Sequence, residues 1–273
     1  MKMFFKISCI LLIGLSYITP ETVPTINNQV SIHTINTPTY IPDVKPEIPI
    51  RSEAHCQSTF THNFCESRLR GDNEPELLNA ISSLAVTIVP FVSGFPTDPI
   101  FYNVACMLSI NGLASFHYHY FLNWFGKQAD EITMILATFF GTWGLIHIYY
   151  PKDSDRNRIN RYNIIAMYVF LVSNTMMQFD PLFPSIFGIY VGWPLYLIYN
   201  IAQKHRVAYK ANLFISLVGT LSWIVSEHFC TEITKYGHPI WHVLFPLGFY
   251  HILLNYDKLK TQIKIEHTRK FYL

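Results

Sequence analysis

Long apolar runs alternate with short polar connections from about residue 77 onward. Each run is close to the ~20 residues that an α-helix needs to cross the ~30 Å hydrocarbon core of a bilayer. Proline and glycine interrupt several runs, which is common in membrane helices. The pattern therefore predicts an all-α membrane protein, built as a bundle of seven transmembrane helices. The predicted spans are Leu77–Phe95, Phe101–Trp124, Ile132–Tyr150, Tyr162–Phe179, Phe183–Ala202, Ala211–Phe229 and Pro239–Tyr256.

Two segments of different composition precede the first predicted span, and a third follows the last one. Residues 1–16 carry two lysines, a short apolar core and a small-x-small motif at their end, which predicts a secretory signal peptide. An uncleaved anchor is the alternative, although the apolar core is short for a span. Residues 17–61 are rich in Pro, Thr, Ile and Asn and lack periodicity, so they predict an extended luminal tether. Residues 257–273 predict a basic cytosolic tail.

Lysine and arginine are distributed unevenly among the predicted loops. The loops 151–162 and 203–210 and the C-terminal tail are basic, and they follow spans three, five and seven. An excess of Lys and Arg marks the cytoplasmic side of a membrane protein, so the N-terminus is predicted to be luminal or extracellular and the C-terminus cytosolic. A signal peptide requires the same orientation. We expect a multi-pass protein of an endomembrane, in the ER or Golgi, or of the plasma membrane.

The composition agrees with a membrane protein and excludes one class of partner. Half of the residues are hydrophobic and only 14% are charged, whereas a soluble chain has roughly a quarter charged residues. The net charge of +2 is too small to indicate a nucleic-acid partner. The sequence implies no protein partner.

Polar residues gather at the predicted luminal ends of three spans. Ser115 and His119 lie four residues apart near the end of span two, so they share one face of a helix. His238 and His242 have the same spacing where span seven begins, and Asp130 lies in the first turn of span three. Ionisable residues within spans are rare and usually functional. Counting along the spans places all five at one depth in the membrane, where they can converge.

Three imidazoles beside a carboxylate suit a catalytic zinc site. Such a site takes three protein ligands and keeps a fourth position for water, whose pKa the metal lowers toward neutrality. Asp130 would orient that water and take its proton, and Ser115 would hydrogen-bond the water or a developing oxyanion. A lone histidine near a helix end is more often a core or interfacial residue, and that interpretation is preferred for His117, His147 and His251.

The chain contains five cysteines. Cys9 lies in the predicted signal peptide, and Cys106 lies within an apolar run as a small core residue. Cys56, Cys65 and Cys230 flank predicted helices, and two of these three can pair if they face an oxidising lumen.

The combination of Ser-x-x-x-His, Asp-Glu and His-x-x-x-His resembles the alkaline ceramidase family, seven-span hydrolases related to adiponectin-receptor-like and Per1-like proteins. The resemblance covers about residues 62–256, and three stretches carry it: FCESRLRGDNEPELLNAISSL, GLASFHYHYFLNWFGKQADEITM and GHPIWHVLFPLGFYHIL. It implies a zinc-dependent amide hydrolase that cleaves ceramide, a membrane lipid, to a sphingoid base and a free fatty acid. In that case His119, His238 and His242 bind zinc, and Asp130 and Ser115 are catalytic.

The segment before the first span departs from the family pattern. A calcium site in the family corresponds to Asn63, Phe64, Glu66 and Glu76 of this chain. Arg68 stands at a ligand position, however, and hard cations need oxygen ligands. The sequence therefore predicts Zn²⁺ and leaves Ca²⁺ open, with a pairing of Arg68 to Glu66 or Glu76 as the alternative.

The resemblance implies two further features at the luminal side. Cys65 and Cys230 occupy family-like positions, so it implies a disulfide between them. In span six, Ser226 stands where the family has an Asp, and Glu227 lies beside it.

Two other functions fit the same predicted fold. A Per1-like hydrolase of GPI-anchored lipids belongs to the same superfamily, but that group has a larger, cysteine-rich segment before the first span. A non-catalytic seven-span lipid receptor would keep zinc for structure, although all five candidate zinc-site residues are present here. Ceramide hydrolysis is the leading hypothesis.

Overall fold

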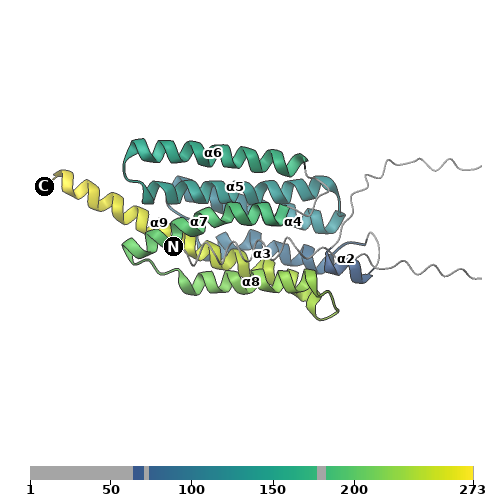
Figure 1. The fold of residues 1–273 in the computed structure, drawn as a ribbon. Helices are drawn as coiled ribbons and strands as arrows, with labels where there is room; N and C mark the ends of the chain where they lie inside the picture. Colours follow the sequence, from purple (N-terminus) through teal and green to yellow (C-terminus); the bar gives the residue numbers. More distant parts are fainter. Residues whose placement is uncertain (1–63, 71–73, 177–182, 273) are drawn as a thin grey trace, which may run out of the picture.

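The computed structural model of the chain describes residues 64–70, 74–176 and 183–272, which are helical apart from short connections (Figure 1). The predicted signal peptide and tether, Asn63, Cys9 and Cys56 lie outside the described residues. None of the described residues is in a β-strand, so the predicted all-α fold is confirmed for this part of the chain. The helices are α2 (Cys65–Arg70), α3 (Leu77–Ser93), α4 (Pro99–Phe121), α5 (Trp124–Tyr149), α6 (Asp153–Met176), α7 (Phe183–His205), α8 (Lys210–His228), the 3₁₀ helix η1 (Thr234–Tyr236) and α9 (Gly237–Tyr272).

Seven of the described helices are 17 residues or longer, and they follow the seven apolar runs in order. By length and composition, α4 and α5 are the two described helices that qualify as candidate membrane spans, and α3 is a shorter apolar helix. Helix α6 begins with the polar stretch DSDRNRINRYN, which lowers its hydropathy. The number of membrane spans therefore stays a prediction.

Helix α9 runs past the end of the last predicted span and includes most of the predicted basic tail. No glycine or proline follows Tyr256, and either residue would favour an end to the helix. The residues that follow are mostly Lys, Leu, Gln, Glu and Ile, which a helix tolerates well. The C-terminal part of α9 consequently projects from the bundle (Figure 1).

Glycines allow two pairs of neighbouring helices to approach closely. A Cβ atom on Gly112 of α4 would lie 2.5 Å from the backbone N of Thr87 on α3. A Cβ atom on Gly248 of α9 would lie 2.3 Å from the backbone O of Asn212 on α8. Small residues permit such backbone contacts in helical membrane bundles. Helix α4 is thus held directly against α3, and α9 against α8, and these four helices carry the three histidines and most of the groups that support them.

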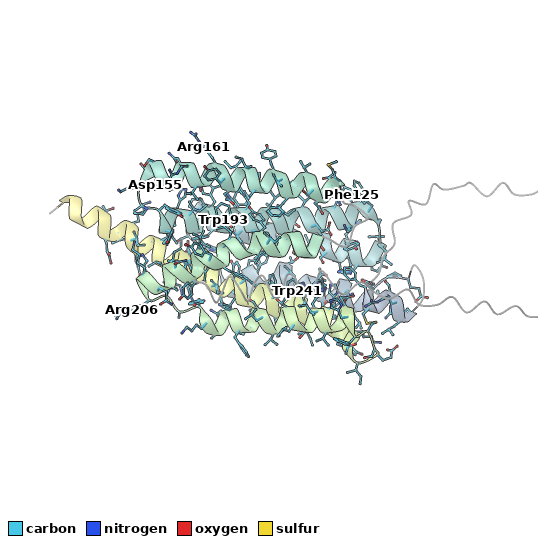
Figure 2. The ribbon with its side chains drawn as sticks, viewed as in Figure 1. Phe125, Asp155, Arg161, Trp193, Arg206 and Trp241 are labelled. Atoms are coloured by element: carbon cyan, nitrogen blue, oxygen red, sulfur yellow. A yellow bond between two sulfur atoms is a disulfide. The ribbon has the colours of Figure 1, made fainter. Side chains whose placement is uncertain are left out.

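Labelled side chains mark the two ends of the bundle (Figure 2). Asp155, Arg161 and Arg206 lie toward the end from which α9 projects, whereas Phe125 lies toward the opposite end. The first turns of α6 and the connection from α7 to α8 are therefore on one side of the molecule. The prediction of a basic loop over residues 151–162 is wrong in part, because α6 begins at Asp153 and includes Arg156, Arg158 and Arg161.

Candidate metal centre

The three histidines that the sequence predicts as metal ligands lie close together in the structure. His119 lies near the end of α4, and His238 and His242 lie in the first two turns of α9. Their exposed fractions are 1%, 4% and 5%, and their ligand atoms all lie within 4.8 Å of one another. The four-residue spacing on α9 places two rings on one helix face, and the packing of α3 between α4 and α9 brings in the third.

Each of the three imidazoles is held from behind through its Nδ1 atom. Metal-binding histidines usually make such a contact, because it fixes the ring orientation and the tautomer and leaves Nε2 to bind the metal. The donor set therefore fits a metal ion. The partners are Glu76 Oε2 for His119 at 2.6 Å, Glu227 Oε1 for His238 at 3.2 Å and Ser82 Oγ for His242 at 2.8 Å.

Glu76 is fully buried where α3 begins and links α3 to the end of α4. Besides its contact with His119, its carboxylate accepts hydrogen bonds from Ser67 Oγ at 2.6 Å and Asn79 Nδ2 at 3.1 Å. Its backbone N–H donates to the carbonyl oxygen of His119 at 2.9 Å. A buried carboxylate needs such donors to offset its lost hydration, so Glu76 is part of the support of the metal centre.

Glu66 has protein donors of a different kind. Its carboxylate accepts hydrogen bonds from the backbone N–H groups of Leu78 and Asn79 at 3.1 and 3.0 Å, which satisfies part of the N-terminus of α3. The guanidinium of Arg70 lies 3.2 Å from the same carboxylate. The two acids that the family resemblance assigns to calcium, Glu66 and Glu76, are therefore both engaged by groups of the protein.

Arg68 has a different partner from the one expected. The sequence analysis gave Glu66 or Glu76 as the partner of Arg68. That expectation is wrong, because the Arg68 guanidinium lies 3.3 Å from Glu227 Oε2. Arg70 makes the contact to Glu66 instead, because both arginines lie on the one short helix α2 and only one can face α3.

Hydrogen bonds connect Ser115 to one of the histidines, and Asp130 is held from the same helix as Ser115. Ser83 Oγ lies 3.4 Å from His242 Nδ1 and donates to Ser115 Oγ at 3.0 Å. Asn111, one turn before Ser115 on α4, donates from Nδ2 to Asp130 Oδ1 at 2.7 Å. Ser115 is buried and Asp130 is half-buried. Asp130 does not belong to the cluster of metal-ligand atoms.

Sequence reasoning missed four of the supporting residues. The sequence places Glu227 only beside Ser226 and Ser82 only within a stretch that carries the family resemblance, and it assigns no role to Ser83 or Asn111. One signal was present, since Asn79, Ser82 and Ser83 recur at helical spacing in an otherwise apolar run. Ser226 itself is buried, and its hydroxyl has no hydrogen-bond partner among the described residues.

Cys65 and Cys230 form a disulfide that joins α2 to the end of α8. The remaining described cysteine, Cys106, is not in a disulfide. Phe64, which precedes α2, places its ring against two of the histidines, with centroid distances of 5.3 Å to His119 and 4.6 Å to His238. Helix α2 is therefore fixed over the metal centre.

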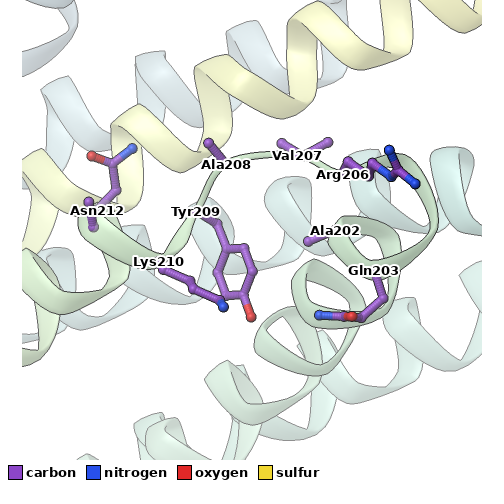
Figure 3. A pocket seen from close by; sticks show the side chains of 9 residues that line it. Ala202, Gln203, Arg206, Val207, Ala208, Tyr209, Lys210 and Asn212 are labelled. Carbon is purple, nitrogen blue, oxygen red and sulfur yellow. The ribbon is translucent and has the colours of Figure 1, made fainter.

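A cavity of about 350 Å³ lies at the other end of the bundle, around the connection from α7 to α8 (Figure 3). Its lining includes Arg206, Tyr209 and Lys210 but none of the histidines of the metal centre. It is separate from the site described here.

The fold and the site together define a class of protein: an all-helical bundle with a buried three-histidine centre that can hold a metal. The model of the ceramidase family matches residues 56–273, and the chain belongs to this family. The resemblance seen in the sequence is thereby confirmed.

Curated relatives agree with this assignment. Mouse alkaline ceramidase 1 is 25% identical over 214 residues, which are 71% of this chain and 74% of the relative. The alkaline ceramidase of Caenorhabditis elegans is 22% identical over 232 residues, 77% of this chain and 85% of the relative. Human alkaline ceramidase 1 is 24% identical over 188 residues, 61% of this chain and 69% of the relative.

Proposed function

We propose that this chain is an integral-membrane, zinc-dependent amide hydrolase that cleaves ceramide to a sphingoid base and a fatty acid. The observation that carries the proposal is the buried cluster of His119, His238 and His242, each held at Nδ1. Hydrogen bonds to neighbouring side chains hold Ser115 and Asp130 in the same part of the bundle. Membership of the ceramidase family and the names of its relatives support ceramide, rather than a GPI-anchored lipid, as the substrate.

The donor set suits zinc, which neutral imidazoles bind well. A zinc ion held there would supply a Lewis acid and make water acidic enough to attack an amide near neutral pH. Asp130 takes the proton of the attacking water and returns it to the amine that leaves, so that amide and water become amine and carboxylic acid. Asn111 donates to the Asp130 carboxylate, and Ser115, which accepts from Ser83, would donate to the developing oxyanion.

The surface of the bundle supports a position within a membrane. Large apolar side chains are exposed on several helices, and such extended apolar surface needs an apolar environment. Examples are Ile81, Phe91, Phe125, Tyr168 and Phe214. We propose that seven helices span the bilayer, with the basic connections in the cytosol and the metal centre toward the lumen or the cell exterior. Ceramide would then reach the site from the bilayer.

A direct test uses the full chain, purified in detergent, with a ceramide that carries a fluorescent acyl chain. We expect release of the fatty acid, loss of activity on zinc chelation and recovery when zinc is added back. His242→Ala should abolish release because it removes a ligand. His251→Ala is the matched control, since His251 lies on the same helix outside the cluster. Stoichiometric zinc with no fatty-acid release from ceramide would contradict the proposal.

A further inference from the structure

Glu227 lies in the last turn of α8, and its side chain contacts both the metal centre and α2. Its Oε1 lies 3.2 Å from His238 Nδ1. Its Oε2 accepts the backbone N–H of Cys65 at 3.1 Å and lies 3.3 Å from Arg68 Nη2. The same guanidinium nitrogen donates to the backbone carbonyl of Glu227 at 2.7 Å. Two groups of α2 therefore fix the carboxylate that supports a metal ligand.

The three histidines are supported unequally. A fully buried carboxylate holds His119, and a neutral serine hydroxyl holds His242. The carboxylate behind His238 lies nearer the surface, with an exposed side-chain fraction of 15%. A carboxylate behind a ligand raises the basicity of the imidazole and fixes its orientation, but only while the carboxylate itself is held in place.

We propose that Glu227 is a positioning residue for His238 and that Arg68 holds Glu227 in place, so that α2 contributes to the metal affinity of the site. The inference rests on the metal centre of the proposed function but not on its substrate. Charge-assisted hydrogen bonds such as those of Arg68 and Glu227 are strong and directional, which suits them to fix one rotamer of Glu227.

The other anchors of α2 allow this contact to be tested alone. The disulfide between Cys65 and Cys230 and the ring contact of Phe64 with His238 do not involve the side chain of Arg68. Replacement of Arg68 therefore removes one support of Glu227 without detaching α2. Arg70 offers a matched control, because it lies on the same helix and contacts Glu66 and the backbone of Pro75 instead of Glu227.

The experiment measures zinc affinity of the full-length apoprotein in detergent by competition with a chromophoric chelator. Glu227→Gln keeps the shape of the side chain but removes its charge, and we expect the dissociation constant to rise about 10-fold. Glu227→Ala should raise the dissociation constant about 100-fold. Removal of a group that supports a metal ligand typically weakens metal affinity about 10- to 100-fold. Arg68→Met should have a smaller effect of the same sign, and Arg70→Met should have none.

A second readout separates positioning from general loss of structure. With cobalt in place of zinc, Glu227→Gln should shift the visible absorption spectrum, while the melting temperature of the apoprotein stays close to that of the parent. Unchanged zinc affinity and an unchanged cobalt spectrum in Glu227→Gln would overturn the inference. Equal losses in Arg68→Met and Arg70→Met would also overturn it, since they would show only a general anchoring of α2. If the variants show the expected changes in zinc affinity and spectrum but the parent protein does not hydrolyse ceramide, the inference about Glu227 is supported. Only the proposed substrate is then refuted.

Discussion

Gly112 on α4 faces the backbone of α3 so closely that even an alanine should push the two helices apart. The added Cβ atom would lie 2.5 Å from Thr87 N and 2.8 Å from Ser83 O, and both atoms belong to the backbone of α3. To reach the ordinary contact distance of 3.4 Å, the helices would have to separate by about 1 Å. Backbone atoms within a helix cannot yield as a flexible side chain can.

The magnitude follows from two opposing effects. Overpacking of this kind costs about 1–3 kcal/mol, whereas Gly→Ala within a helix contributes roughly 1 kcal/mol of stability. The expected net loss of stability is therefore at most about 2 kcal/mol, which the fold survives. The site should suffer more, because the contacts of Ser82 with His242 and of Ser83 with Ser115 both cross from α3. A misplacement of 1 Å near reacting groups can reduce the rate about 100-fold.

The assay compares thermal stability and ceramide turnover of Gly112→Ala with those of Gly141→Ala. The Cβ atom of an alanine at position 141, on α5, would meet nothing closer than 4.0 Å. We expect Gly141→Ala to be as stable as the parent or slightly more stable, with full activity. Parental turnover in Gly112→Ala would refute the reasoning that close contact of α3 and α4 sets the geometry of the site.

Two further predictions concern the chemistry and the second candidate metal. Asp130→Asn should lower kcat about 100- to 10,000-fold, as expected for loss of a general base. The zinc content should stay at the parental value, because Asp130 is outside the ligand cluster. Loss of zinc, measured by elemental analysis, would contradict the assigned role of Asp130. Because protein donors already engage Glu66 and Glu76, removal of calcium with a selective chelator should leave the melting temperature unchanged. A decrease that added calcium reverses would contradict this.

The residues that one helix brings together were predictable from the sequence. His238 and His242, like Ser115 and His119, share a face because the helical period dictates it. The approximate level of His119 and Asp130 followed from counting residues along spans that reverse direction. These inferences needed only the length and the periodicity of apolar runs.

Contacts between helices were not predictable in the same way. Ser82 lies 160 residues from His242, and Glu227 lies 159 residues from Arg68. Such pairs depend on which helices are neighbours and on how each is rotated about its axis. The identity of the arginine that meets Glu66 depends on the rotation of the short helix α2, for which the sequence offers no periodic signal.

The order of the metal ligands along the chain has a consequence for biosynthesis. His119 lies on α4, whereas His238 and His242 lie on α9, the most C-terminal of the described helices. A ribosome makes the N-terminal parts first, so a nascent chain can present a single ligand until α9 has been made and has packed against its neighbours. Under the proposed function, tight zinc binding would report a finished molecule, and chains that stall or insert incorrectly before α9 would not acquire activity.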